Sequence, residues 1–367
     1  MTRTCAIVGG GLAGFCAHAT LRKGGLEPAE IAVFGTDPDP AAQWRGRAQA
    51  IRQRRMRSES DGHCAPRSFP GLAVRAARRR KTPVPLVLSL LDLYHPTVDE
   101  FLGHVEELRA RSGWDASLHP GRVERIRAVE GGFELDGEGP FRHVLVATGH
   151  PGLNVPEELV GDPRVVHAYE PHDYAPEVEI VGAGMAAATE WLNALQAGST
   201  VVSVRRREPE RRPLNLPRHL FTRRGLASFH RKGGNERIEL LRRYSAPSFP
   251  TGSEWDVPVE SAVREGRFQV APSLNGAAQV ICATGFKSGY REDSLLAALV
   301  DDHGLKTAGS WIALAPDSTV PALTGSSRTL ALAGVAGQWA FPAADTLMGA
   351  KYAARAFLRR VTACRSR

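Results

Sequence analysis

Near its beginning the chain reads CAIVGGGLAGFCAH, and the glycines of this stretch have the spacing that binds the pyrophosphate of a dinucleotide. Gly9, Gly11 and Gly14 follow an apolar run and precede apolar residues at helical spacing. Such glycines permit a tight turn, a close approach of the backbone to the phosphates and close packing of a helix on a strand. Because a second strand-like run, EIAVFG, follows, we predict a dinucleotide-binding β-α-β unit.

A second stretch, VEIVGAGMAAATEW, repeats this arrangement near residue 180. Gly182, Gly184 and Ala187 occupy its three small-residue positions. Arg205 falls where an NAD site places an acidic residue on the ribose hydroxyls, and Arg206 follows it. Guanidinium groups at this point bind a 2′-phosphate through charge-assisted hydrogen bonds. The second stretch therefore predicts a site for NADPH.

The position that holds the ribose in the first unit is unusual. Counting from the first glycine turn, the acidic residue of this site is expected at position 35, and the sequence has Gly35 there. Asp37 is the nearest carboxylate that could replace it. The alternative is that backbone groups and water hold the ribose.

Two apolar runs, HVLVATG and AQVICATG, end in the same tripeptide and divide the chain. Each lies downstream of one glycine stretch, so the chain contains one large repeat. We predict an α/β fold with two Rossmann-like dinucleotide-binding domains, the second inserted into the first. The expected boundaries are 1–150 for the first part of one domain, 151–285 for the inserted domain, and 286–367 for the segment that returns to the first.

Other elements follow from local patterns. Apolar residues at helical spacing predict a helix over 97–113, and the stretch 121–137 is typical of two strands joined at its Gly-Gly pair. The Arg-rich stretch 41–82 is expected to cross a ligand surface without regular structure. The stretch 208–277 is expected to be poor in helix.

Composition excludes several classes of protein. The net charge is +8, yet 41 of the 47 basic residues are arginines and no aromatic residues alternate with them, so a nucleic-acid partner is not expected. The five cysteines have neither CxxC nor metal-ligand spacing. No apolar stretch approaches the ~20 residues of a membrane span, and no export signal is evident, so we expect a soluble cytoplasmic protein without a membrane partner.

In motif order the chain resembles the group B flavin-containing monooxygenases and their N-hydroxylating relatives. The similarity covers most of the chain and rests on GGGLAG, QWR, VLVATGHPGLNVPEELVGDPRVVHAYEPHDY, ICATGF and the closing segment LALAGVAGQWAFPAADTLMGAKYAARAF. It implies FAD in the first domain, with the NADPH domain inserted into the FAD domain. The implied reaction uses NADPH and O2 to oxidise a nitrogen, a sulfur or a carbonyl carbon of a small molecule through a flavin C4a-hydroperoxide.

The resemblance also implies residues that contact the cofactors. In addition to the glycines it points to two residues of the QWR motif, four at the crossings between domains, and one in the closing segment: Trp44, Arg45, Thr148, Gly149, Thr284, Gly285 and Gly334. Trp339 and Asp345 are our own further candidates for cofactor contact in that segment. The chain departs from the family at Gly35, where relatives carry glutamate, and in MRSESDGHCAP, where many relatives have an asparagine beside the flavin.

Four residues are candidates for catalysis. Ser58, Asp61 and His63 lie in the Arg-rich stretch and could contact the flavin edge or the substrate, or could instead be turn residues bonded to their own backbone. Gln338 lies in the closing segment, where it could contact the ring. Asp345 could alternatively cap the final helix.

Three classes of function remain open from the sequence. The first is the NADPH-dependent monooxygenase, with a homodimer as a candidate assembly. The second is an FAD-dependent dehydrogenase or reductase that transfers no oxygen, which the same fold would serve equally well. The third is a non-catalytic dinucleotide-binding or regulatory protein.

Overall fold

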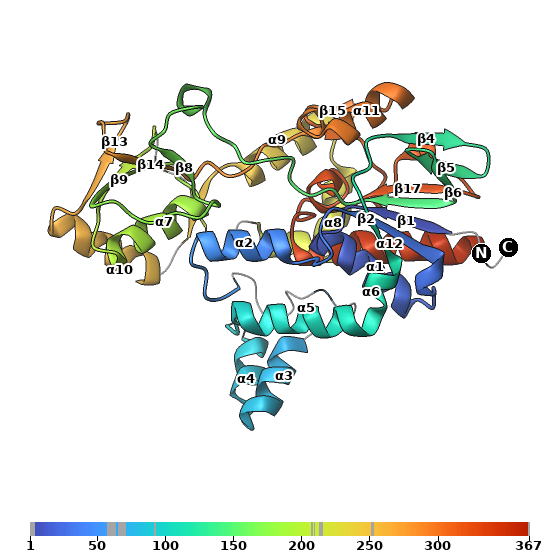
Figure 1. Cartoon of the computed structure of the whole chain (residues 1–367), viewed down its shortest axis with the longest axis horizontal. Helices are drawn as coiled ribbons and strands as arrows, with labels where there is room; N and C mark the ends of the chain where they lie inside the picture. The colour runs from blue at the N-terminus through green and yellow to red at the C-terminus, as the bar shows by residue number, and fades with distance from the viewer. Residues whose placement is uncertain are drawn as a thin grey trace.

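The structure, a computed structural model, describes residues 4–56, 64, 71–91, 93–206, 208, 210–212, 216–250 and 253–365. Two parallel five-stranded sheets organise the described chain, and they lie toward opposite ends of an elongated molecule (Figure 1). The predicted α/β fold with two Rossmann-like units is confirmed.

Strands from both ends of the chain form the first sheet. Its order is β17-β7-β1-β2-β3, and every neighbouring pair is parallel. The strands are β1 (Cys5–Val8), β2 (Ile31–Gly35), β3 (Leu118–Pro120), β7 (His143–Val146) and β17 (Thr329–Leu332). Because β17 follows the whole second sheet in the sequence, the chain returns to its first sheet as the inserted arrangement requires.

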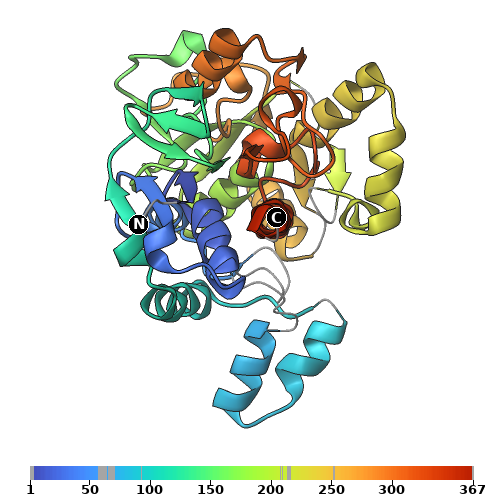
Figure 2. The ribbon, with the colours of Figure 1, turned by 90° about the vertical axis from the view of Figure 1, so that its right-hand side faces the viewer.

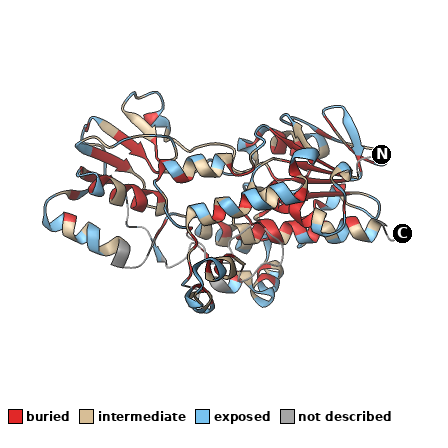
Figure 3. Cartoon of the chain, turned by 60° about the horizontal axis from the view of Figure 1, so that its bottom comes forward, coloured by how far each residue is buried: buried red, intermediate tan, exposed pale blue. Residues whose placement is uncertain are grey.

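Both faces of the first sheet are covered, and its strands β1 and β2 are apolar and buried throughout. Residues such as Ile7 face α1 (Leu12–Lys23) and α12 (Leu347–Arg365), whereas alternate residues such as Val8 face the opposite layer. That layer contains a small antiparallel sheet of β4 (Ile126–Val129), β5 (Gly132–Leu135) and β6 (Glu138–Phe141). The strand pair predicted over 121–137 is confirmed, and Figure 3 shows the buried strands of the first sheet in red.

The second sheet is built wholly from the inserted part of the chain. Its order is β13-β10-β9-β14-β8, again all parallel. The strands are β8 (Val165–His167), β9 (Glu177–Val181), β10 (Thr200–Val204), β13 (Phe268–Ala271) and β14 (Gln279–Cys282). The helices α7 (Met185–Gln196) and α10 (Ser253–Arg264) cover one face.

The remaining elements connect and cover these sheets. The other helices are α2 (Ala42–Ala50), α3 (Gly71–Arg80), α4 (Val84–Leu90), α5 (Val98–Ser112), α6 (Trp114–Ser117), α8 (Arg223–Arg231), α9 (Gly234–Ser245) and α11 (Ser294–His303). The short strands are β11 (Glu210–Arg212), β12 (Ser248–Pro250), β15 (Thr307–Ala308) and β16 (Trp311–Ile312). Single 3-10 turns are η1 (Pro28–Glu30), η2 (Glu157–Leu159), η3 (Arg218–Phe221), η4 (Tyr290–Glu292), η5 (Pro321–Leu323) and η6 (Gly334–Gly337).

Two expectations about irregular chain are wrong. Helices α2 and α3 lie within 41–82, and α8, α9 and α10 lie within 208–277. These helices bury few residues; α8, for example, buries only Leu226 and Phe229. Leu226 and Phe229 lie three residues apart on one face, so the helical period is present in the sequence; the Arg-rich composition around it led to the expectation of irregular chain. The helix predicted over 97–113 is confirmed as α5.

Two segments connect the domains, and they run side by side in opposite directions. Leu153 and Phe286 form an isolated antiparallel bridge, and the backbone N–H of Lys287 donates to the carbonyl of Gly152 at 2.9 Å. The two connections therefore form one two-stranded link rather than two independent linkers.

Candidate functional site

The first glycine turn is shaped by contact between backbones. Gly9 has φ +116°, and a Cβ there would lie 2.2 Å from the carbonyl oxygen of Ala147 at the end of β7. A Cβ on Gly14 would lie 2.0 Å from the carbonyl oxygen of Gly9. Gly11 is the N-cap of α1 and, within the described chain, no side chain caps that helix. The first N–H groups of α1 are thus left to bind an anion.

The second glycine turn has the same construction. Gly182 has φ +135°, and its Cβ would lie 2.5 Å from the carbonyl oxygen of Ala283 at the end of β14. Gly184 is the N-cap of α7, again with no side-chain cap in the described chain, and Ala187 is fully buried against the sheet. Each alanine of the repeated Ala-Thr-Gly tripeptide therefore lies against the first glycine of its own turn, which explains why both elements recur together.

The residue at position 35 is glycine for a steric reason. A Cβ on Gly35 would lie 2.8 Å from the Cα of Gly10, so the turn and the end of β2 touch through their backbones. Asp37 is exposed beyond the strand, where its Oδ1 accepts from the N–H of Asp39 at 2.8 Å. The guanidinium of Arg45 is already paired, because it donates to the carboxylate of Asp39 at 2.5 Å.

Two further predicted residues lie close to this turn. A Cβ on Gly334, which has φ +63°, would lie 3.7 Å from the Cβ of Ala13 in α1. The closing segment therefore returns to the first glycine turn. Trp44, on α2, is half-buried and packs edge-on against Phe101 of α5, with ring centroids 4.9 Å apart.

The Thr-Gly pairs at the two domain crossings are built alike in their backbones. Gly149 and Gly285 both have φ +79°, a left-handed conformation that favours glycine. Thr148 donates to Oδ2 of Asp293 at 2.7 Å, and the other oxygen of this carboxylate caps α11. Thr284 donates to a backbone carbonyl of the other crossing segment. Asp293 is a functional neighbour that the sequence analysis missed, although an aspartate before an apolar helical run is a recognisable N-cap signal.

A cavity of about 250 Å³ opens where the crossing segments meet the closing segment. It is lined by residues of both crossings, α9, η4, β16 and η6: Gly149, Pro151, Arg242, Ser245, Ala246, Ser288, Gly289, Tyr290, Asp293, Leu296, Ser310, Trp311, Ile312, Val335, Ala336 and Gln338. The indole Nε1 of Trp311 donates to Oε1 of Gln338 at 3.1 Å. Because an indole only donates, this bond fixes which end of the amide is oxygen and leaves the Gln338 NH2 as the donor available to a ligand.

Trp339 and Asp345 occupy different environments in the closing segment. Trp339 is buried, and the guanidinium of Arg237 lies 3.9 Å from its ring centroid. Asp345 has an exposed side chain, and desolvation by the surrounding protein raises its pKa to about 6. Thr346 caps α12 by accepting from the N–H of Gly349 at 3.1 Å, which leaves Asp345 free of that role.

The two predicted phosphate-binding arginines differ in how exposed and how closely paired their guanidinium groups are. Arg205 is nearly buried, pairs with Glu208 at 2.7 Å and lies over the ring of Trp191. Arg206 is 90% exposed, and its nearest carboxylate, on Glu158, is 3.7 Å away. The N–H donors of Arg206 are therefore accessible to a ligand, while Arg205 supports the end of β10.

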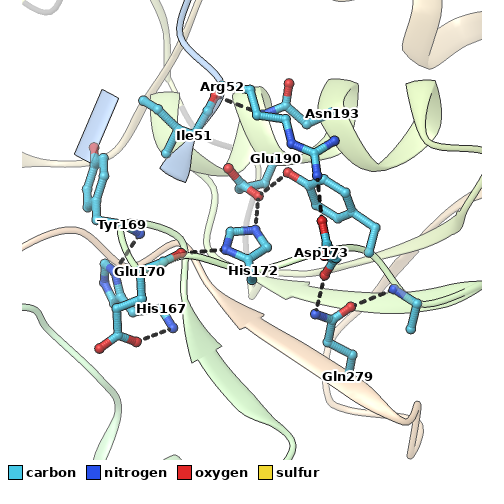
Figure 4. Close-up of polar contacts among 12 residues, drawn as sticks. Ile51, Arg52, His167, Tyr169, Glu170, His172, Asp173, Glu190, Asn193 and Gln279 are labelled. Atoms are coloured by element: carbon cyan, nitrogen blue, oxygen red, sulfur yellow. Dashed lines mark hydrogen bonds and ion pairs between the residues drawn. The ribbon is translucent and has the colours of Figure 1, made fainter. Parts of the chain in front are cut away.

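A buried polar cluster joins the second domain to the end of α2 (Figure 4). Glu190, on α7, is fully buried and accepts from Tyr174 at 2.8 Å, with Nε2 of His172 at 2.9 Å. Burial alone would lower the pKa of His172, but its bond to Glu190, its bond to the carbonyl of Glu170 and the charge of Glu190 together raise it. From the first domain, the guanidinium of Arg52 lies 4.6 Å from the Tyr174 ring centroid. A glutamate amid the apolar residues of α7 is the sequence signal that was overlooked.

Aromatic residues stack beside the crossings. The ring of Phe286 stacks with His150 and with Tyr169, at centroid distances of 4.2 and 4.9 Å. Arg47, from α2, lies over the same ring. Burial, reinforced by the charge of Arg47, lowers the pKa of His150 to about 4. This histidine is therefore neutral at physiological pH.

Three predicted catalytic residues, Ser58, Asp61 and His63, lie outside the described residues. The structure gives no test of their roles. In the part of the chain that it does describe, no group of three His, Cys, Asp or Glu side chains could hold a metal ion. No described helix is long and apolar enough to cross a membrane.

Several solved structures share this architecture. No protein-family model matches the sequence, and the search of curated proteins found no significant match. The ornithine hydroxylase PvdA from Pseudomonas aeruginosa superposes with a TM-score of 0.72 at 16% identity, covering 98% of this chain and 100% of that one. The chain has the fold of this hydroxylase. An ornithine N-hydroxylase of Kutzneria sp. 744, described with reduced FAD, NADP+ and L-ornithine, gives 0.73 at 14% identity over 99% of each chain.

The same fold also occurs in a protein that is not a hydroxylase. The bacillithiol disulfide reductase Bdr from Bacillus cereus gives a TM-score of 0.60 at 16% identity, with both chains covered completely. At these identities the likeness concerns the arrangement of the two dinucleotide-binding domains. The activity has to be argued from the site.

Proposed function

We propose that this protein is an FAD- and NADPH-dependent monooxygenase that transfers one oxygen atom from O2 to a nitrogen, a sulfur or a carbonyl carbon of a small molecule. The observation that carries the proposal is the pair of glycine turns, built alike and each closed by the alanine that ends a neighbouring strand. Two dinucleotides held by one chain serve electron transfer between them.

The first turn fits FAD. Gly9 and Gly14 allow the tight backbone contacts of the turn, a Cβ on Gly11 would meet open space, and the uncapped start of α1 offers N–H groups to a pyrophosphate. Gly334 brings the closing segment to the same turn, and Asp37 is the carboxylate proposed to bind the ribose. FAD, once reduced, supplies the activation of O2; the protein supplies binding and orientation.

The second turn fits NADPH. Gly182, Gly184 and Ala187 form the pyrophosphate cradle, and Arg206 is the exposed cation proposed to bind the 2′-phosphate. Arg205 is proposed to act mainly by keeping the end of β10 in place through Glu208 and Trp191. The domain boundaries at 150 and 285 and the homodimer stay predictions.

The cavity at the crossings is the proposed substrate site. Its volume of about 250 Å³ is near the lower end of the ~300–1,000 Å³ of ligand pockets, which suits a small substrate. The amide NH2 of Gln338, oriented by Trp311, is proposed to donate a hydrogen bond at the reacting centre. Apolar lining from Ile312 and Val335 limits the water around that donor.

The test is the absorption spectrum of the purified protein under anaerobic conditions, after NADPH, and then after air. We expect a flavin band that NADPH bleaches and that O2 restores. With candidate amines, sulfides and ketones, oxygenated product should match the NADPH consumed. A protein that binds no FAD even when FAD is added contradicts the proposal.

A reductase without oxygen transfer is the second candidate, because the bacillithiol disulfide reductase shares the fold. It predicts the same bleaching by NADPH, but electrons then pass to an added acceptor such as a disulfide. In air without an acceptor, all the NADPH consumed would appear as hydrogen peroxide. Product analysis against peroxide yield separates the two.

A further inference from the structure

A helical hairpin projects from the first domain, away from both sheets. It consists of α3 and α4, and it lies beyond α5 at the lower edge of the molecule (Figure 2). It is supported by α5, through ion pairs such as Arg75 with Glu107, and by Tyr94, which packs against apolar residues of α3. The hairpin belongs to neither glycine turn nor to the cavity.

The outer face of α4 is apolar, which is the reverse of a normal surface helix. Val84, Val87, Leu90 and Leu91 recur at helical spacing, with exposed fractions of 55%, 52%, 75% and 63%. Leu93 continues this face with 60% exposed. On the opposite side of the helix, Pro85 and Ser89 are buried. We call this exposed set the apolar face of α4.

The hairpin carries positive charge only. Residues 71–91 contain five cations and no aspartate or glutamate. Arg78, Arg79, Arg80 and Lys81 follow one another at the turn into α4, and all four are exposed. Arg79 and Arg80 share one carboxylate, that of Glu100, so this pairing neutralises only part of their charge.

We propose that the hairpin docks the protein on an anionic membrane surface. Apolar side chains beside a cluster of cations are the features with which a helix lies in the interface of an anionic bilayer. The cations would meet lipid headgroups, while Val87 and Leu90 enter the boundary of the acyl chains. This contact needs no spanning segment, so it is consistent with the absence of a described membrane-crossing helix.

A second copy of the chain fits this surface less well. A stable interface buries about 800 Å² on each partner, whereas α4 presents one face of a seven-residue helix. A symmetric contact would also bring two all-positive hairpins together, which costs free energy. A lipid surface has the opposite charge and the shape to accept a projecting hairpin.

The experiment is flotation of the full-length protein with vesicles of phosphatidylcholine, with and without 30% phosphatidylserine, across a range of salt. We expect binding to the anionic vesicles that weakens as salt rises, and little binding to the neutral ones. Val87→Glu combined with Leu90→Glu should reduce binding at least about tenfold. Arg78→Gln combined with Lys81→Gln should reduce it by about 5-fold per cation removed.

Val257→Glu combined with Val270→Glu is the matched control, because these two valines are comparably exposed, at 56% and 52%, on the second domain. This control should bind like the unaltered protein. An unchanged unfolding temperature shows that each variant is folded. If the Val87→Glu and Leu90→Glu variant is not, the milder pair Val87→Ser with Leu90→Ser takes its place. Binding that survives the α4 changes, or absence of binding at low salt, overturns the proposal. So does a stable dimer that the Glu variants dissociate, since α4 would then be an interface between copies.

Discussion

The two glycine turns are alike in their backbones and different in the side chains that surround them. In both, the first glycine touches the carbonyl of the alanine that ends the neighbouring strand. Beyond this, the first turn meets Gly35, which has no side chain, whereas the second leads to Arg205 and Arg206. The comparison teaches that the backbone of each turn is dictated by sterics, while the nucleotide selectivity that we propose depends on the few side chains after the second strand.

The largest effect should come from adding a methyl group to each turn. Gly9→Ala should abolish FAD binding and lower the unfolding temperature, because the Cβ overlaps Ala147 and positive φ alone costs an alanine about 1–3 kcal/mol. Gly182→Ala should weaken NADP+ binding about 100-fold or more while flavin is retained. Flavin absorbance, calorimetric titration with NADP+ and thermal unfolding measure these outcomes.

Gly46→Ala is the control for both turns, because a Cβ there meets nothing within 4 Å and alanine favours the helix. It should leave both nucleotides bound. If Gly182→Ala also released the flavin, the two turns would not be independent sites.

The next effect concerns the ribose of the first nucleotide. Asp37→Asn should weaken FAD binding about tenfold, since a hydrogen bond to a charged group contributes about 1.5–3 kcal/mol. Gly35→Glu should not improve binding, because its Cβ would collide with Gly10. Fluorescence titration of the apoprotein with FAD measures both. The control is Asp99→Asn, an exposed aspartate on α5. Equal FAD affinity of Asp37→Asn and the control would mean that backbone groups, rather than Asp37, bind the ribose.

Arg206→Ala should raise the dissociation constant for NADP+ about tenfold and leave that for NAD+ unchanged, because only NADP+ carries the 2′-phosphate. Arg264→Ala, an exposed arginine at the end of α10, serves as the control. Calorimetry with both nucleotides gives the answer without a known substrate. A uniform loss for NADP+ and NAD+ would mean that Arg206 acts on the pyrophosphate or the fold instead.

The smallest effect is a pH dependence that only the second domain should show. The raised pKa of His172 means that its bond to Glu190 stabilises the folded state fully below the ordinary histidine pKa of about 6.5. This contribution is lost as pH rises through the pKa of the folded state, by at most about 1.4 kcal/mol per pH unit. The difference in unfolding temperature between the unaltered protein and Glu190→Gln should therefore shrink from pH 5.5 to 8.5.

Comparing the unfolding temperatures of these two proteins cancels the contribution of His150 to stability. The lowered pKa of His150 makes that contribution fall as pH decreases, opposite to that of His172. His150 stays neutral in both, and its effect appears only as pH falls from about 6.5 toward 4. A difference that grows with pH would contradict the assignment of the charge to His172.

The sequence predicted what depends on local sterics and periodicity. The glycines, the repeated Ala-Thr-Gly, the helix over 98–112 and the return to the first sheet all follow from short patterns. The helices α8 and α9 were missed because their Arg-rich composition suggested irregular chain, although their apolar residues do recur at helical spacing. The bonds of Trp311 with Gln338 and of Thr148 with Asp293 join residues far apart in sequence, so no local pattern encodes them.

The return of β17 to the first sheet sets an order for folding during synthesis. The second sheet ends at Cys282, so the ribosome delivers it whole before β17 and α12 exist. Domains fold as units once their chain is available. In this protein, the domain that begins first in the sequence is thus completed last, and its β7 edge and the face of α1 that α12 covers stay open until β17 and α12 have been synthesised.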